Sequence, residues 1–123
     1  MIEHLDGERF VSVQTFRHSG GPVATPVWFA SFEDGFVFGT HTDSGKVRRI
    51  RAEPAVRFAA ANYRGLERRD YTDGCAEILG GHEAVAAESA LSDKYGWQWF
   101  PFSRLIDCYV RVVPNRKVTD DGR

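Results

Sequence analysis

The sequence predicts a mainly β protein: a small antiparallel barrel of six strands, with one short and one longer helix packed at its openings. Three observations lead to this fold class. Short segments of alternating, β-branched or aromatic residues recur along the 123-residue chain. Turns that contain glycine or proline separate several of these segments. Only two segments carry the apolar spacing of a helix.

Length and composition indicate one domain spanning residues 1–123, with a core of about 10–113 and a polar tail, 114–123, that is expected to fray. The composition, 42% hydrophobic and 27% charged, is that of a globular protein. No apolar run has the length of a membrane span, and the N-terminus lacks the order of a signal peptide, so we expect no membrane partner and a cytoplasmic location. A net charge of -1 argues against nucleic-acid binding.

Cysteine and histidine spacing predicts neither a disulfide nor a metal site. Cys75 and Cys108 lie far apart, each in an apolar, strand-like stretch, which favours buried free thiols. The four histidines show no short spacing of the kind that metal ligands have: His4, His18, His41 and His82.

The first two strands form a predicted hairpin. Phe10 to Arg17 alternates as a half-buried strand does, and His18 to Pro22 reads as a turn. Val23 to Phe32 is the second strand, with Pro26 in its middle. Proline cannot donate to a ladder, so Pro26 implies a sheet edge, a bulge, or a place where the strand leaves one partner for another.

A tight turn leads into the third strand, Gly35 to His41, and a short helix follows it. Either Asp43 or Ser44 can cap this helix, which runs to about Ala52 and stops before a proline. Val47 and Ile50, three residues apart, supply its buried side.

The second half of the chain holds two further strands and an exposed loop between them. The fourth strand runs from Pro54 to Asn62, and the polar, charged segment Tyr63 to Arg69 is the loop. Tyr71 to Leu79 is the fifth strand, with Gly74 as a candidate bulge.

The longer helix spans His82 to Tyr95, because an apolar stripe recurs there at helical spacing and Gly96 stands at the expected stop. Trp97 to Leu105 is an aromatic connection. Ile106 to Val113 alternates cleanly and forms the sixth strand.

A concentrated basic stretch lies on the short helix: four of the six residues from Lys46 to Arg51 carry positive charge. Ser44, Gly45 and Lys46 occupy the first turn, where unpaired backbone N–H groups and the helix dipole favour an anion. A phosphate there could take a hydroxyl, one or two amides and the ammonium. The alternative is that the basic run is only a solvated helix face.

Neighbouring segments strengthen the anion interpretation. Thr40 and Thr42 end the preceding strand with hydroxyls that can reach a phosphate. One strand earlier, the backbone of the segment Thr25, Pro26, Val27 and Trp28 could meet a planar heterocycle, although a tryptophan such as Trp28 can equally belong to the core. Together these elements would form a phosphate grip beside a flat apolar groove.

The order of these motifs resembles the pyridoxamine 5′-phosphate oxidase-like split-barrel superfamily, and within it the branch of coenzyme F420-dependent enzymes. The motifs span roughly residues 10 to 113, and each is short. They are Thr15-Phe-Arg17, Thr25-Pro-Val-Trp28, Thr40, Ser44-Gly-Lys-Val-Arg-Arg-Ile50, Glu53-Pro54, Gly74-Cys-Ala76 and Lys94-Tyr-Gly-Trp97.

What the resemblance implies is a six-stranded, FMN-binding-like split barrel that forms a homodimer, with cofactor sites at the subunit interface. Ser44 and Lys46 would hold the cofactor phosphate, with help from Thr40 and, in the deazaflavin branch, Arg48. The segment Thr25 to Ala30 would run beside the ring. The aromatic segment Trp97 to Phe102 is a candidate for interface surface.

The function implied is an oxidoreductase in which F420, a deazaflavin, exchanges a hydride with a small organic substrate. The cofactor's acidic tail would give Arg48, Arg49 and Arg51 partners that FMN would leave unmatched. Alternatives are an FMN-binding oxidoreductase and a non-catalytic protein that binds a flavin, a deazaflavin or a tetrapyrrole. No general acid is identified. The additional substrate-binding residues of pyridoxine phosphate oxidases have no counterpart here, so vitamin B6 oxidation is not expected.

Overall fold

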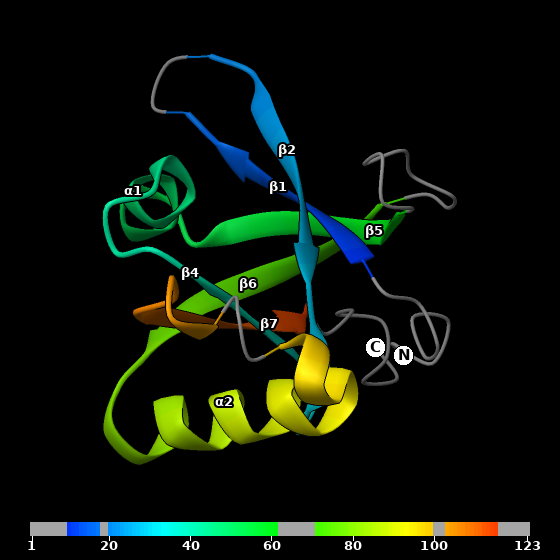
Figure 1. Cartoon of the computed structure of the whole chain (residues 1–123). Coiled ribbons are helices and arrows are strands. Elements are labelled where there is room, and N and C mark those ends of the chain that lie inside the picture. The colour runs from blue at the N-terminus through cyan, green and yellow to red at the C-terminus, as the bar shows by residue number, and fades with distance from the viewer. Residues whose placement is uncertain (1–9, 18–19, 62–70, 100–102, 116–123) are drawn as a thin grey trace.

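A computed structural model describes residues 10–17, 20–61, 71–99 and 103–115. Seven strands form one antiparallel sheet in the order β2-β1-β5-β6-β7-β4-β3. The sheet curls, with α1 near the β1–β2 hairpin and α2 across another part of it (Figure 1). The strands are β1 Phe10–Phe16, β2 Pro22–Trp28, β3 Ala30–Phe32, β4 Gly35–Thr40, β5 Ala55–Ala61, β6 Thr72–Leu79 and β7 Cys108–Pro114. The helices are α1 Gly45–Ala52, α2 Gly81–Tyr95 and the 3-10 turn η2 Gly96–Gln98.

The mainly β fold class is confirmed, with seven strands in place of six because the predicted second strand divides at Phe29. Before that residue β2 pairs with β1, and after it β3 pairs with β4. Pro26 therefore lies in an edge strand that then changes partner, two of the three situations that its presence implied. The Tyr95 hydroxyl accepts from the Phe29 N–H and donates to the Phe29 carbonyl, each at 2.9 Å, so it satisfies the backbone at the break.

The larger core cluster lies on one face of the curled sheet. Alternate residues of β1, β4, β5 and β7 point into it, as period-2 patterning requires. Helix α1 adds its buried pair, Val47 and Ile50, to the same cluster, as the sequence predicted. The fully buried aromatic rings of this core are Phe36, Phe38 and Phe58, together with Phe29 at the strand break.

Helix α2 packs against the opposite face through a second apolar cluster. Ala87, Leu91 and Tyr95 form its buried stripe, and they contact Ala30 and Val37 of the sheet in that cluster. The predicted stop is confirmed, because Gly96 caps the helix with φ +61, a conformation that glycine adopts without strain.

Two expectations are wrong. Gly74 is not a bulge, since its pairing with both neighbouring strands is continuous. It is a glycine because a Cβ there would lie 2.9 Å from the Val113 carbonyl oxygen. Cys75 is a free but exposed thiol, because its position alternates with the buried Gly74 and Ala76, whereas Cys108 is buried as expected.

Several predictions fall on residues outside those described: part of the hairpin turn (18–19), the loop 63–69 and most of the tail. The β1–β2 hairpin itself is confirmed by the pairing of Phe16 with Pro22. Within the described part of the chain, no helix combines the length and the apolar character needed to cross a membrane.

Candidate functional site

The N-terminus of α1 is built around Ser44. Its side chain accepts from the Val47 N–H at 3.3 Å, so it caps the helix, and Asp43 does not. The buried Thr40 donates to the Ser44 hydroxyl at 3.3 Å, which ties the end of β4 to the cap. The hydroxyls that the sequence placed near a phosphate therefore do lie together.

Lys46 lies in the first turn of α1, and its side chain is half-buried. Burial and the positive charge of Arg49 both lower the pKa of Lys46 from its ordinary value of 10.5. Among the described residues it has no hydrogen-bond or ion-pair partner. A desolvated ammonium that lacks a protein counter-charge is the electrostatic setting of an anion site.

A cavity of about 300 Å³ opens beside this lysine. Strand β2 contributes Pro26, Val27 and Trp28 to its wall, and α1 contributes Lys46. Lys46 of the predicted phosphate grip thus lines one cavity with the predicted ring-facing stretch, from which a whole strand separates it in the sequence. Its volume lies at the lower end of the range that small-molecule sites occupy.

The wall is completed by residues that sequence reasoning did not select: Gly39, Trp99 and Ile106. A Cβ on Gly39 would lie 2.6 Å from Ile106, so only glycine leaves room here. A glycine inside a strand is a known sign of close approach, and it was the available signal for Gly39. No local pattern identifies Trp99 or Ile106, because the connection between α2 and β7 brings them to the site.

Three aromatic rings stack along this wall. Trp28 and Tyr95 have ring centroids 4.5 Å apart at 20°, and Tyr95 and Trp99 have centroids 6.2 Å apart at 24°. The two interpretations of Trp28 are therefore compatible: it packs against the α2 cluster and also faces the cavity. The stack gives the cavity a flat aromatic side.

Arginines surround the basic turn. The Arg49 Nε–H donates to the Thr15 hydroxyl at 2.6 Å, and Arg48 donates to the Asp43 carbonyl at 2.8 Å. The pKa of Arg49 is lowered by burial first and then by the nearby charges of Arg17 and Arg48. This mutual repulsion shows that positive charge accumulates here.

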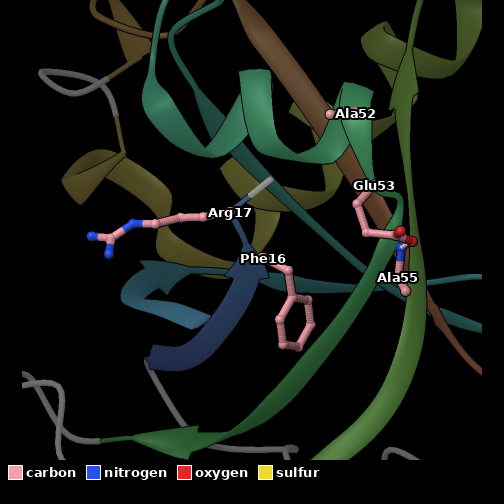
Figure 2. Close-up of a pocket in the computed structure, with 5 residues that line it drawn as sticks. All are labelled: Phe16, Arg17, Ala52, Glu53 and Ala55. Atoms are coloured by element: carbon pink, nitrogen blue, oxygen red, sulfur yellow. Dashed lines mark hydrogen bonds between the residues drawn. The ribbon is translucent and has the colours of Figure 1, made fainter. Parts of the chain in front are cut away.

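A second cavity, of about 390 Å³, begins beyond this cluster and is lined by Phe16, Arg17, Ala52, Glu53 and Ala55. Figure 2 shows that the Arg17 side chain extends away from Glu53. The Glu53 carboxylate instead accepts from the Ala55 N–H at 3.2 Å. Among the described residues, Arg17 therefore has no ion pair with the carboxylate that lines its cavity.

The remaining predicted site residues lie nearby without lining the cavity. Gly45 lies beneath Arg49, whose guanidinium would be 2.8 Å from a Cβ at that position. Thr25 is paired with Val13 on β1. The Thr42 N–H and hydroxyl both donate to one Asp107 oxygen, at 2.7 and 3.2 Å, so both hydrogen-bond donors of Thr42 are already bonded to a carboxylate. These bonds lower the pKa of Asp107.

The sequence leaves open whether Tyr63, His41, Tyr109 or only water protonates the product. His41 is exposed, and Tyr63 lies outside the described residues. Burial, with a smaller contribution from Glu88, raises the pKa of Tyr109 to about 12, which makes its phenol a weak acid near neutral pH.

Solved structures similar to this one share its fold. The heme storage protein HutZ of Vibrio cholerae superposes with a TM-score of 0.75 at 14% identity, covering 94% of this chain and 87% of its own. A conserved hypothetical protein of Mycobacterium tuberculosis gives 0.70 at 23% identity, covering 91% and 76%. An FAD-binding protein of Mesorhizobium loti gives 0.64 at 18% identity, covering 91% and 83%.

These identities are low, so the likeness establishes the split-barrel fold and not a shared ligand. No curated protein matches the chain in sequence. A family model described as pyridoxamine 5′-phosphate oxidase matches residues 2–117, nearly the whole chain. The chain therefore belongs to the pyridoxamine 5′-phosphate oxidase family of split-barrel proteins.

Proposed function

We propose that the chain is an oxidoreductase that binds a deazaflavin, coenzyme F420, and exchanges a hydride between it and a small organic substrate. The observation that carries this proposal is the shared cavity, in which Lys46 of α1 and the Pro26–Trp28 segment of β2 face one space. A flavin-type cofactor has the same two parts, an anionic phosphate and a flat ring system.

The donor set fits such a cofactor. The half-buried Lys46 ammonium has no counter-charge among the described residues, and a phosphate would supply one. The N-terminus of α1 adds its dipole, although its capping hydroxyl at Ser44 is already shared with Thr40 and Val47. The aromatic wall of Trp28 and Trp99 suits a planar ring.

The residues of this chain bind and orient the cofactor and exclude water from it. When bound, the deazaflavin supplies the hydride chemistry, so no catalytic triad is needed. Lys46 would fix the phosphate end, and β2 would align the ring through its edge backbone. Val27, 8% exposed, and the buried Trp99 keep the wall of the cavity apolar, which strengthens electrostatic contacts inside it.

The excess of arginines favours F420 over FMN. F420 carries acidic groups beyond its phosphate, and these groups would find counter-charges in Arg49 and in the two arginines whose charges lower its pKa, Arg17 and Arg48. Arg48→Ala should therefore weaken F420 binding several-fold while changing FMN binding little. Arg57→Ala is the matched control, because that exposed arginine pairs with Asp73 instead.

A heme-binding role is the second candidate, since HutZ is a heme storage protein with this fold. Heme iron needs an axial ligand such as histidine, cysteine, methionine or tyrosine. None of the residues described as lining the Lys46 cavity is of these types. The donor chemistry of the cavity therefore favours the flavin-type ligand.

We further propose that the chain is a homodimer with its cofactor sites at the subunit interface, as the family resemblance implies. In the segment suggested as interface surface, Trp97 is 82% exposed while Trp99 is 4% exposed, and 100–102 lie outside the described residues. Sedimentation equilibrium should find a dimer that F420 stabilises. A chain that stays monomeric when saturated with F420 would refute the dimer.

Fluorescence titration of the purified chain with F420, FMN and hemin tests the ligand. We expect F420 to bind tightest and hemin to bind without a defined stoichiometry. Turnover is tested separately, by asking whether bound reduced F420 is oxidised by quinones, enones or tetrapyrroles faster than free F420 is. Tight binding without faster oxidation would identify a carrier rather than an enzyme.

A further inference from the structure

A cavity of about 410 Å³ lies at the C-terminal end of α2, next to the Lys46 cavity but with different chemistry. Trp99 lines both cavities, so they are neighbours. The other lining residues here are Glu88, Ser92, Gly96, Trp97 and Ser103. The space beside Gly96 is open, since nothing lies within 4 Å of where its Cβ would be.

Two aromatic side chains belong to this cavity, and one of them is unusually open. Trp97 is 82% exposed, far more than a tryptophan that only fills a core. The face of an indole carries negative charge density and attracts cations. In a dimer that leaves it open, Trp97 is therefore a surface on which a cationic group could rest.

The charge on the described lining of this cavity is negative. Glu88 is the only charged residue among those described as lining it, and it has no ion-pair partner among the described residues. The C-terminus of α2 ends here, so its dipole adds partial negative charge. Lys94, in the same last turn, does not line the cavity; its ammonium lies 3.6 Å from the centre of the Phe29 ring.

We propose that this cavity binds a small organic cation, an alkylammonium group held over the indole of Trp97 and paired with the carboxylate of Glu88. A carboxylate, an indole face and a helix C-terminus each favour a cation, and all three meet at one cavity. Ser92 lines the same space, and its hydroxyl suits a hydroxyl on the ligand. The site does not depend on the cofactor, because its residues other than Trp99 are separate from the Lys46 cavity.

Calorimetric titration with choline tests the proposal, with 3,3-dimethyl-1-butanol as the neutral probe of nearly the same shape. Choline should bind saturably with a Kd on the order of 1 mM, and the neutral alcohol at least tenfold more weakly. Glu88→Gln should weaken choline binding roughly fivefold and Trp97→Leu at least threefold. Glu83→Gln, on the exposed first turn of the same helix, should leave it unchanged.

Four results would overturn the proposal. Absence of saturable choline binding rules out the site, and equal binding of the neutral alcohol reduces it to an apolar groove. If Glu83→Gln weakens binding as much as Glu88→Gln, only the general charge of the helix is at work. In each titration, acrylamide quenching of tryptophan fluorescence is measured on the wild type and on Trp97→Phe, and the difference between the two reports whether Trp97 is open to solvent. A shielded Trp97 in a dimer means that a second copy occupies the surface, and also overturns the proposal.

Discussion

Replacing Tyr95 by phenylalanine tests whether the Tyr95 hydroxyl stabilises the break between β2 and β3. The Tyr95 hydroxyl makes two 2.9 Å hydrogen bonds, to the N–H and the carbonyl of Phe29, and Tyr95 is 6% exposed. Without the hydroxyl both backbone groups stay buried and unpaired. Each such group costs about 1–3 kcal/mol, so we expect a loss of about 2–4 kcal/mol in the free energy of unfolding.

Urea denaturation followed by tryptophan fluorescence measures this loss. With a slope of about 2 kcal/mol per molar urea, the midpoint should fall by about 1–2 M at unchanged slope. Tyr109→Phe is the matched control, since Tyr109 packs against the same cluster and its hydroxyl has no hydrogen-bond partner among the described residues. A Tyr95→Phe variant that loses less than about 0.5 kcal/mol would show that the hydroxyl does not hold the break together.

Three further predictions concern titration and packing. Because burial and the charge of Arg49 lower the pKa of Lys46 from 10.5, Lys46 loses its proton at a lower pH than an ordinary lysine does. F420 affinity should therefore begin to fall below pH 10.5 as the pH rises, and Lys46→Arg should abolish that fall; a flat wild-type profile up to pH 10.5 would remove Lys46 from the site. Because the pKa of Tyr109 is raised to about 12, the phenol keeps its proton to a higher pH in the folded chain than in the unfolded chain. The free energy of unfolding should therefore drop between about pH 10 and 12. An ultraviolet titration in which Tyr109→Phe removes no late ionisation step would contradict this. A Cβ at Gly35 would overlap the Val112 carbonyl oxygen, so Gly35→Ala should lower the free energy of unfolding, measured by chemical denaturation, by about 3 kcal/mol or more. Gly21→Ala is the control, because nothing lies within 4 Å of its Cβ position, and it should change that free energy by less than about 1 kcal/mol. Equal effects of the two substitutions would refute the packing argument.

Local sequence patterns predicted most of the fold. Alternation located the strands, and the cap at Ser44 and the stop at Gly96 located the helices, because these signals depend on neighbouring residues alone. The strand break at Phe29 was not predictable as a division into two strands. It depends on the Tyr95 hydroxyl, 66 residues away.

The site shows the same limit. The resemblance and the charge pattern pointed to Lys46 and to the Pro26–Trp28 segment, which the fold brings to one cavity. Trp99 was missed because its position depends on how the segment after α2 folds back. The partnership of Thr42 with Asp107 was missed for the same reason, since it joins the end of β4 to the start of β7.

The central claim is that Lys46 holds the phosphate of a cofactor whose planar ring lies along β2. The most direct measurement is a four-way comparison of dissociation constants: wild type and Lys46→Ala, each with F420 and with the deazaflavin analogue that lacks the phosphate and everything beyond it. The account predicts that Lys46→Ala weakens F420 roughly tenfold or more, a coupling of about 1.5–3 kcal/mol, and leaves the analogue unchanged. Equal losses for both ligands, or no loss for F420, would contradict it.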